Sequence, residues 1–303
     1  MSFRTARPRA IVLLAALAGC SLAPPPAVVL LTDFGTKDGA VAAMKGVVAA
    51  VDPRLRAEDL THEIAPFDVW EGAVRLSEAA PYWPPGTVFV GVVDPGVGTE
   101  RHPIVLRTAT GHLFVGPDNG LFTLVAETLG IDEVRRIDEA GNRRPGSERS
   151  HTFHGRDLFS YAAARLAAGK VAFEGVGPRL EAPPVMIPYR KAELLGRTLR
   201  GMIPALDVNF GNVWTNVGEA LLSKLNVGVG DTLRVRITRG EQVAADLLLP
   251  YAFSFGRVPE GADLLYLNSQ GNVSFATNMG SFAERHGVAA GPEWDVEIGR
   301  WPR

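Results

Sequence analysis

Hydrophobic and polar positions along the chain follow two different patterns, and the change falls after residue 184. In the first part, continuous apolar runs such as "AVVLLTDFG" and "GTVFVGVVDPGVG" end in acidic turns, as expected for strands that are buried on both faces. The segments "DGAVAAMKGVVAAVDP" and "GRDLFSYAAARLAAG" have helical spacing, and Gly169 ends the second. Strands that alternate with helices predict a mostly parallel α/β sheet.

The second part consists of short strand-like runs that are separated by Gly, Asn and Asp turns, including "DTLRVRITRG" and "DLLYLNSQGNVSFATN". This pattern is typical of a small β-sandwich or barrel. We therefore predict an α/β domain over residues 28–192 and a smaller, all-β, barrel-like domain over residues 193–303.

The N-terminal segment has the pattern of an export signal. Three arginines precede the apolar stretch "AIVLLAALAG", which is too short to span a bilayer comfortably. It closes with "LAGC", which resembles the lipobox of bacterial lipoproteins, although a cysteine at the end of an ordinary signal is an alternative. We expect a signal over residues 1–19, lipidation of Cys20 and a tether over residues 20–27. The expected location is outside the cytoplasm, on a membrane that faces the periplasm or the cell exterior.

Composition excludes some classes of function. The chain of 303 residues has 31 basic and 33 acidic residues and a net charge of −2, so no overall field favours nucleic acid. The one basic run, residues 141–150, is rich in turn formers and predicts a solvated loop. Cys20 is the only cysteine, which excludes an intrachain disulfide. No dinucleotide fingerprint or P-loop follows the predicted strands.

Candidate chemistry lies at turns. Asp33 and Asp94 end predicted parallel strands, where ligands bind in open sheets, although either could simply form a turn or cap a helix. "DVNFGNVWTN" mixes amides with aromatic rings, which suits stacking on a flat ring. His151, His154 and Asp157 have helical spacing that is compatible with a metal site, a catalytic role or an ordinary helix start.

Eight motifs occur together in order: "TDFGTKDG", "MKGVV", "DLTHEI", "GTVFVGVVDPGVGTER", "VGPDNGL", "TFHGRDLF", "DVNFGNVWTN" and "LNSQG". This set resembles the S-adenosyl-L-methionine (SAM) hydrolase (adenosine-forming) family, which is related to the SAM-dependent fluorinase and chlorinase. The resemblance implies an α/β N-terminal domain, a β-barrel C-terminal domain and a homotrimer with substrate between subunits. It also implies SAM as the substrate, adenosine and L-methionine as products, and no cofactor.

The family uses an Asp–Arg–His triad to activate water, and its motifs place that triad on Asp94, Arg101 and His154. A guanidinium would stabilise developing hydroxide, while the carboxylate and imidazole orient the water and accept its proton. The residues leave the division of the proton between Asp94 and His154 open. No further ligand cluster is apparent in the sequence, and Gly155 and Arg156 look more like a helix entry beside an anionic group, so we expect no metal. In the fluorinase, tyrosines replace this Asp and His, and a serine stands at Gly155, so hydrolysis is favoured over halogenation.

The resemblance also implies the substrate contacts. Asp33 would bind the ribose hydroxyls, beside Phe67, and Asp38 and Ser269 would bind the methionine end. On the C-terminal domain it implies Asp207 for the ammonium group, Asn212 for the adenine edge, and Phe210, Trp214 and Phe253 around the ring. Two departures from the fluorinase pattern are Gln270 and Thr277, which replace arginines.

Two other functions remain open from the sequence. An exported lipoprotein could bind SAM or a nucleoside without significant turnover, because SAM is made in the cytoplasm. A SAM-dependent halogenase is the other alternative. In either case the predicted partner is a small molecule, and the only membrane contact would be through the N-terminal lipid.

Overall fold

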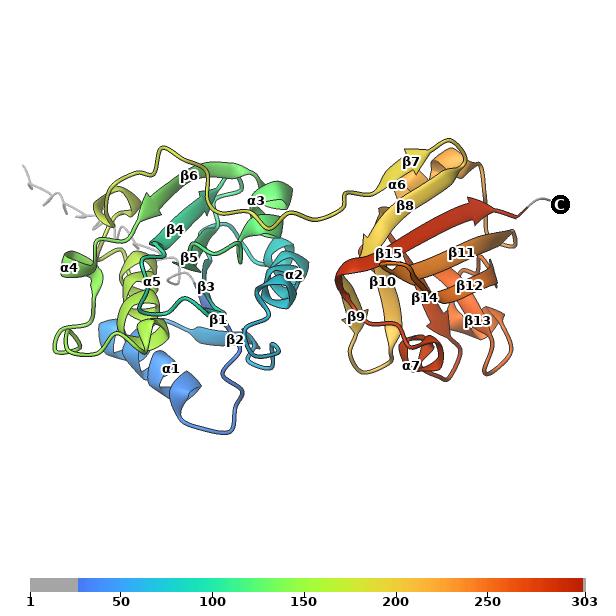
Figure 1. Cartoon of the computed structure of the whole chain (residues 1–303). Coiled ribbons are helices and arrows are strands. Elements are labelled where there is room, and N and C mark those ends of the chain that lie inside the picture. The colour runs from blue at the N-terminus through green and yellow to red at the C-terminus, as the bar shows by residue number, and fades with distance from the viewer. Residues whose placement is uncertain (1–26, 302–303) are drawn as a thin grey trace, which may run out of the picture.

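The computed structural model describes residues 27–301. Cys20, the predicted signal and most of the tether lie outside the described residues. Figure 1 shows an α/β part connected by an extended segment to an all-β part. Within the described range, no helix combines the length and apolarity needed to cross a bilayer.

The α/β part contains one six-stranded sheet with the order β2-β1-β3-β5-β4-β6. The first four strands in that order are parallel, whereas β4 runs antiparallel to both β5 and β6. The sheet is therefore mixed, with a parallel portion that carries the predicted site. The strands are β1 (Val28–Thr32), β2 (Ala57–Thr61), β3 (Val88–Val92), β4 (Pro103–Thr108), β5 (Leu113–Pro117) and β6 (Ile131–Arg136).

Helices cover both faces of this sheet (Figure 1). Alternate side chains of β1 separate the two cores: Val28 and Leu30 pack with α1 and α5, while Val29 and Leu31 pack with α2 and α3. Burial on both faces explains why β1 is a continuous apolar run. The helices are α1 (Ala40–Val51), α2 (Val69–Ala79), α3 (Thr123–Leu129), α4 (Glu139–Asn142) and α5 (Ser160–Ala167).

The all-β part has two antiparallel sheets, with orders β13-β14-β10-β9 and β12-β11-β15-β8-β7, around one apolar core. These sheets, together with the mixed sheet, confirm the predicted fold class. The strands of the all-β part are β7 (Glu193–Leu195), β8 (Thr198–Ile203), β9 (Ala205–Asp207), β10 (Asn212–Gly218), β11 (Thr232–Arg239), β12 (Gln242–Pro250), β13 (Asp263–Leu267), β14 (Asn272–Thr277) and β15 (Gly291–Arg300). The part also contains the short helices α6 (Glu219–Leu222) and α7 (Phe282–His286).

Helix α2 forms contacts between the two parts of the molecule. The indole Nε1 of Trp70 donates to the carbonyl of Pro204 at 3.1 Å, and Arg75 Nη2 donates to the carbonyl of Leu206 at 3.1 Å. Trp70 also packs in a small apolar cluster with Met202 and Ala205. Side chains from the α/β part thus bind main chain of the all-β part directly.

Candidate active site

The carboxyl ends of β1 and β3 bring two predicted acidic residues to one edge of the sheet. Thr32 pairs with Val92 in the parallel register of β1 and β3. Asp33 directly follows β1 and Asp94 lies two residues after the end of β3, so both follow the carboxyl ends of adjacent strands. Open parallel sheets bind ligands at this edge because the connecting loops diverge there. The topology therefore places both carboxylates where the sequence predicts a site.

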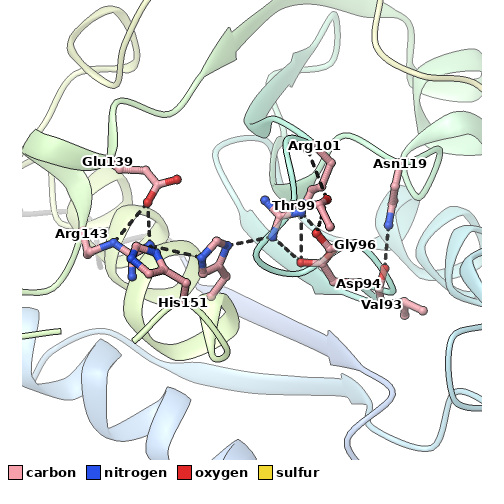
Figure 2. Close-up of polar contacts among 10 residues, drawn as sticks. Val93, Asp94, Gly96, Thr99, Arg101, Asn119, Glu139, Arg143 and His151 are labelled. Carbon is pink, nitrogen blue, oxygen red and sulfur yellow. Dashed lines mark hydrogen bonds and ion pairs between the residues drawn. The ribbon is translucent and has the colours of Figure 1, made fainter. Parts of the chain in front are cut away.

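Asp94, Arg101 and His154 form one hydrogen-bonded cluster. Figure 2 shows Arg101 bound to Asp94 in this cluster. Arg101 Nε donates to Asp94 Oδ1 at 2.9 Å, and its Nη2 also contacts Asp94 Oδ2. The same Nη2 lies 2.8 Å from His154 Nδ1. Asp94 and His154, which are 60 positions apart in the sequence, thus share the Arg101 guanidinium as their common partner.

This cluster is shielded from bulk solvent. The side chains of Asp94 and Arg101 are 5% and 9% exposed, and His154 is 5% exposed overall. The Arg101 guanidinium lies 5.2 Å from the centre of the Phe159 ring. Its Nη1 has no hydrogen-bonding partner among residues 27–301, so this nitrogen is the donor that remains for a bound water.

The environment of His154 favours its neutral form. Burial lowers the pKa of His154 below 6.5, and the charges of Arg101 and Arg143 lower it further, against opposing effects of Glu139 and Asp94. A neutral imidazole keeps a lone pair that can accept a proton at neutral pH. His154 also immediately precedes a π-helical turn, Gly155–Phe159, before α5. Such turns are rare and often lie at functional sites.

A second guanidinium, that of Arg143, contacts the other ring nitrogen of His154, and Figure 2 shows Arg143 beside Glu139 and His151. Arg143 Nη2 is 2.6 Å from Glu139 Oε2, 3.2 Å from His154 Nε2 and 3.4 Å from His151 Nδ1. Acceptor atoms of Glu139, His151 and His154 lie within 4.8 Å of one another, a spacing that could suit a metal ion. The Arg143 side chain already provides a cation among them.

The sequence grouping of His151, His154 and Asp157 is not the grouping that the structure shows. Asp157 is fully buried and accepts hydrogen bonds from Arg156 Nε at 2.8 Å and Arg144 Nε at 3.1 Å. It therefore holds the loop before α5 against the π-helical turn. Nor is the basic run simply a solvated loop, because the Arg143 side chain is only 6% exposed.

The buried carboxylate of Asp157 leads to a prediction about stability. Asp157→Asn keeps the side-chain volume but removes the charge that both arginines bind, so we expect a loss of about 2 kcal/mol, discounted for the partial exposure of the arginines. Thermal unfolding should show a correspondingly lower Tm. Asp246→Asn, which weakens an exposed pair with Arg234, is the matched control and should have a smaller effect. Equal Tm changes in the two variants would refute this role.

Asp33 and Phe67, both predicted to contact ribose, contact each other. The Phe67 backbone N–H donates to Asp33 Oδ2 at 2.9 Å, and Phe67 has a φ of 69°, a conformation that is unfavourable for a bulky residue. The Phe67 side chain is nevertheless 69% exposed. The Asp33 carboxylate thus holds a strained backbone that presents an aromatic ring to the surface.

The predicted residues of the all-β part lie elsewhere. Asp207, Phe210 and Asn212 line a cleft of about 1160 Å³, which also includes α2 residues. Asn212 Nδ2 donates to Asp207 Oδ2 at 3.2 Å, and Phe210 is 67% exposed. None of the three triad residues lines this cleft. Within one chain, Asp94, Arg101 and His154 therefore form one group, and Asp207, Phe210 and Asn212 line a separate cleft.

The remaining predicted residues are more scattered. Asp38 is exposed and its Oδ1 accepts from the Ala40 N–H at 2.9 Å, at the start of α1. Trp214 is half-buried and packs on the apolar cluster around Trp70. Phe253 and Ser269 are exposed in loops of the all-β part, as is Gln270, whereas Thr277 is buried. Their contacts with substrate stay predictions.

Sequence reasoning missed Glu139 and Arg143. The only local signal is their i, i+4 spacing, which allows an ion pair on one helix face. That spacing is common on solvated helices, so it does not indicate that Arg143 contacts His154, eleven residues later in the sequence.

Comparisons with known proteins agree over both parts of the chain. Residues 28–177 match the model of the SAM hydroxide adenosyltransferase N-terminal domain, and residues 201–295 match that of its C-terminal domain. The (R)-S-adenosyl-L-methionine hydrolase of Salinispora tropica is 38% identical over 282 residues, which cover 92% of this chain and 100% of that protein. A fluorinase from Nocardia brasiliensis is 31% identical over 301 residues, covering 90% of this chain and 97% of that protein.

Solved structures are similar as well. The crystal structure of an uncharacterised conserved protein from Thermotoga maritima superimposes with a TM-score of 0.83 at 37% sequence identity, covering 90% of this chain and 100% of the other. A conserved hypothetical protein from Thermus thermophilus gives a TM-score of 0.67 at 34% identity, covering 90% of this chain and 99% of the other. The two matched domains and the full-length relatives show that this chain belongs to the SAM hydroxide adenosyltransferase family.

Proposed function

We propose that the protein hydrolyses SAM to adenosine and L-methionine, with Asp94, Arg101 and His154 as its catalytic residues. The observation that carries this proposal is the buried cluster in which one guanidinium contacts both a carboxylate and a neutral imidazole. Relatives named (R)-S-adenosyl-L-methionine hydrolase support the same reaction.

The chemistry requires an activated water rather than a leaving-group acid. The water oxygen forms a bond to ribose C5′ as the C5′–S bond breaks, and the bonding electron pair neutralises the sulfonium to give the methionine thioether. Arg101 Nη1 would bind the water and stabilise the negative charge that develops on it. The water's proton passes to His154 or Asp94 and then to solvent. Because burial and two cations lower the pKa of His154, this residue is neutral and can accept it at pH 7.

The reaction needs no cofactor, and we propose none. Arg143 supplies a fixed positive charge beside His154 without an added ion. The sulfonium of SAM is itself a good leaving group, so neither a metal nor a redox group is required for bond cleavage.

We further propose that the working enzyme is a homotrimer whose sites lie between subunits. The triad belongs to the α/β part, whereas the residues proposed for adenine line a cleft that excludes the triad in one chain. Phe67, Phe210 and Phe253 expose large aromatic rings, 69%, 67% and 76% respectively, which a neighbouring subunit and substrate would cover. A second copy would supply the missing half of each site.

Subunit mixing tests the shared site. Arg101→Met and Asn212→Ala would each inactivate a homotrimer, but in mixed trimers some sites would combine an intact triad with an intact adenine contact. We expect mixing, under conditions that allow subunit exchange, to restore part of the activity. Each variant alone, refolded in the same way, is the control. If exchange is verified and activity does not return, a site within one subunit is favoured.

The reaction is tested with the purified chain and SAM. Chromatography should detect adenosine and methionine in equal amounts, and a His154→Ala control should form much less. SAM binding without turnover would instead support the nucleoside- or SAM-binding alternative. Formation of 5′-chloro-5′-deoxyadenosine in high chloride would support the halogenase alternative.

Lipidation of Cys20 and export are proposed on the N-terminal sequence pattern alone, since these residues lie outside the described range. In a bacterial host, radiolabelled palmitate should label the full-length chain but not Cys20→Ser. Labelling of both chains, or of neither, would contradict a lipid anchor at this position.

A further inference from the structure

We propose that Glu139 and Arg143 form a positioning pair that fixes the ring and the tautomer of His154 for the hydrolysis. This inference rests on the proposed function, because it assigns a role beside one of the proposed catalytic residues. The pair lies on α4 and the loop that follows it, whereas Asp94 lies in the loop after β3.

The hydrogen-bonding capacity of the groups around His154 supports a defined tautomer. Guanidinium nitrogens donate only, yet Arg101 Nη2 lies 2.8 Å from Nδ1 and Arg143 Nη2 lies 3.2 Å from Nε2. A neutral imidazole has a single accepting nitrogen. The shorter contact assigns the lone pair to Nδ1, facing Arg101, and the hydrogen to Nε2, facing the Glu139–Arg143 pair. His154 then accepts the water's proton at Nδ1 when the water replaces Arg101 Nη2 as the donor to this nitrogen.

Glu139 is the carboxylate placed to accept from the Nε2–H group, although the two residues form no direct hydrogen bond in this structure. One of its carboxylate oxygens lies within 4.8 Å of a ring nitrogen of His154, a gap that one water or a small rotation would close. Arg143 anchors that carboxylate through Nη2 at 2.6 Å and Nε at 3.2 Å. Arg143 is in turn held by its Nη1, which donates to the Ser150 carbonyl at 3.3 Å.

The two residues act on His154 with opposite charges. Arg143 disfavours the imidazolium and Glu139 favours it, while burial and Arg101 also disfavour it and Asp94 favours it. His151 is the other titratable group at this side of the ring, with its ring centre 6.2 Å away. Removal of Arg143 or of Glu139 should therefore change the protonation of His154 in opposite directions.

NMR of the imidazole groups tests the pair without requiring turnover, with the His154 signals assigned by their absence in His154→Ala. Nitrogen chemical shifts of the unaltered protein should report Nε2–H. Arg143→Met should raise the pKa of His154 by roughly half a unit or more, and Glu139→Gln should lower it. Arg143→Lys keeps the charge and should largely preserve the pKa.

Kinetics provide the second measurement. Arg143→Met should lower kcat about 10-fold or more, with little change in KM, and should shift the acid limb of the pH profile upward. Arg143→Lys should lower kcat but leave the acid limb near its original position. The matched control is Arg149→Met, which removes the same charge from an exposed arginine in the same loop without a contact to His154; it should change neither measurement.

The outcomes separate the two proposals. An inactive unaltered protein would overturn the proposed function, while the NMR measurements would still test the pair. An active protein in which Arg143→Met behaves like Arg149→Met would overturn the pair alone. Shifts of the His154 pKa in the same direction for Arg143→Met and Glu139→Gln would also overturn it, because general loosening of the loop would then explain both.

Discussion

Replacement of Arg101 with methionine should lower kcat for SAM hydrolysis by about 10³-fold, because this side chain is the proposed donor to the developing hydroxide. Methionine keeps much of the apolar side-chain volume beside Phe159 but provides no N–H donor. Binding of SAM should change much less than turnover, since Arg101 is assigned to the water. Single-turnover kinetics and equilibrium binding of SAM measure the two effects separately.

Arg149→Met is again the matched control, because it removes an arginine whose side chain has no described contact. The Asp94→Asn variant should also bind SAM and turn over slowly. It replaces the carboxylate that accepts hydrogen bonds from Nε and Nη2 of Arg101 with a neutral amide, which holds the guanidinium less firmly. If Arg101→Met and Asp94→Asn both retained the full rate, the catalytic assignment would be wrong even though the family is established.

Replacement of His154 with alanine should have the second large effect, a decrease in kcat of about 10²-fold or more. In the unaltered protein, burial and the charges of Arg101 and Arg143 lower the pKa of His154 below 6.5. The neutral form therefore predominates at pH 7, and kcat should fall only when the pH drops below that lowered pKa. The pH profile of His154→Ala should lose this acid limb, together with most of the rate.

A stopped assay over pH 4.5–8, with the fold checked by circular dichroism at each pH, measures this dependence. His151→Ala is the comparison variant. His151 is exposed and contacts Arg143 at 3.4 Å and the edge of the His154 ring, but it is not a proposed catalytic residue, so the acid limb of this variant should remain. An acid limb that persists unchanged in His154→Ala would assign the titration to another group.

The sequence predicted the parts of the fold whose burial is uniform. β1 and β3 are buried on both faces, so each is a short continuous apolar run, and such a run is typical of a buried strand. β2 was not predicted, because "AEDLT" is half-exposed at the sheet edge and its polar side chains hide the strand pattern. The sequence predicted a strand pair with a Gly turn over "HPIVLRTATGHLFVGPDNG", and β4 and β5 form this pair in antiparallel register. β6 was not predicted, because its side chains are mostly exposed or half-buried and hide the strand pattern.

The site divides in a similar way. The ends of β1 and β3 predicted that Asp33 and Asp94 share an edge, because parallel strands bring their carboxyl ends together. Arg101 and His154 came from family resemblance alone; no local pattern indicates that their side chains meet. Arg143 was assigned to a solvated loop, because its burial depends on the way that loop folds back over His154.

Asp157 illustrates a different limit. Its spacing from His151 and His154 suggested a shared ligand, yet its carboxylate points to Arg144 and Arg156. Residues 151–153 are not helical and residues 155–159 form a π-helical turn, so ordinary helical spacing does not relate these three side chains. Sequence spacing alone could not predict this turn.

Oxygen-isotope incorporation is the most direct test of the central claim, which is that a water activated by Asp94, Arg101 and His154 attacks C5′ of SAM. The purified protein would convert SAM in ¹⁸O-labelled water, and mass spectrometry would locate the isotope in the two products. We expect one ¹⁸O atom at the 5′ oxygen of adenosine, none in methionine, and a rate of labelled product that falls with Arg101→Met. Adenosine without the isotope, or labelled product formed at an unchanged rate by Arg101→Met, would contradict this claim.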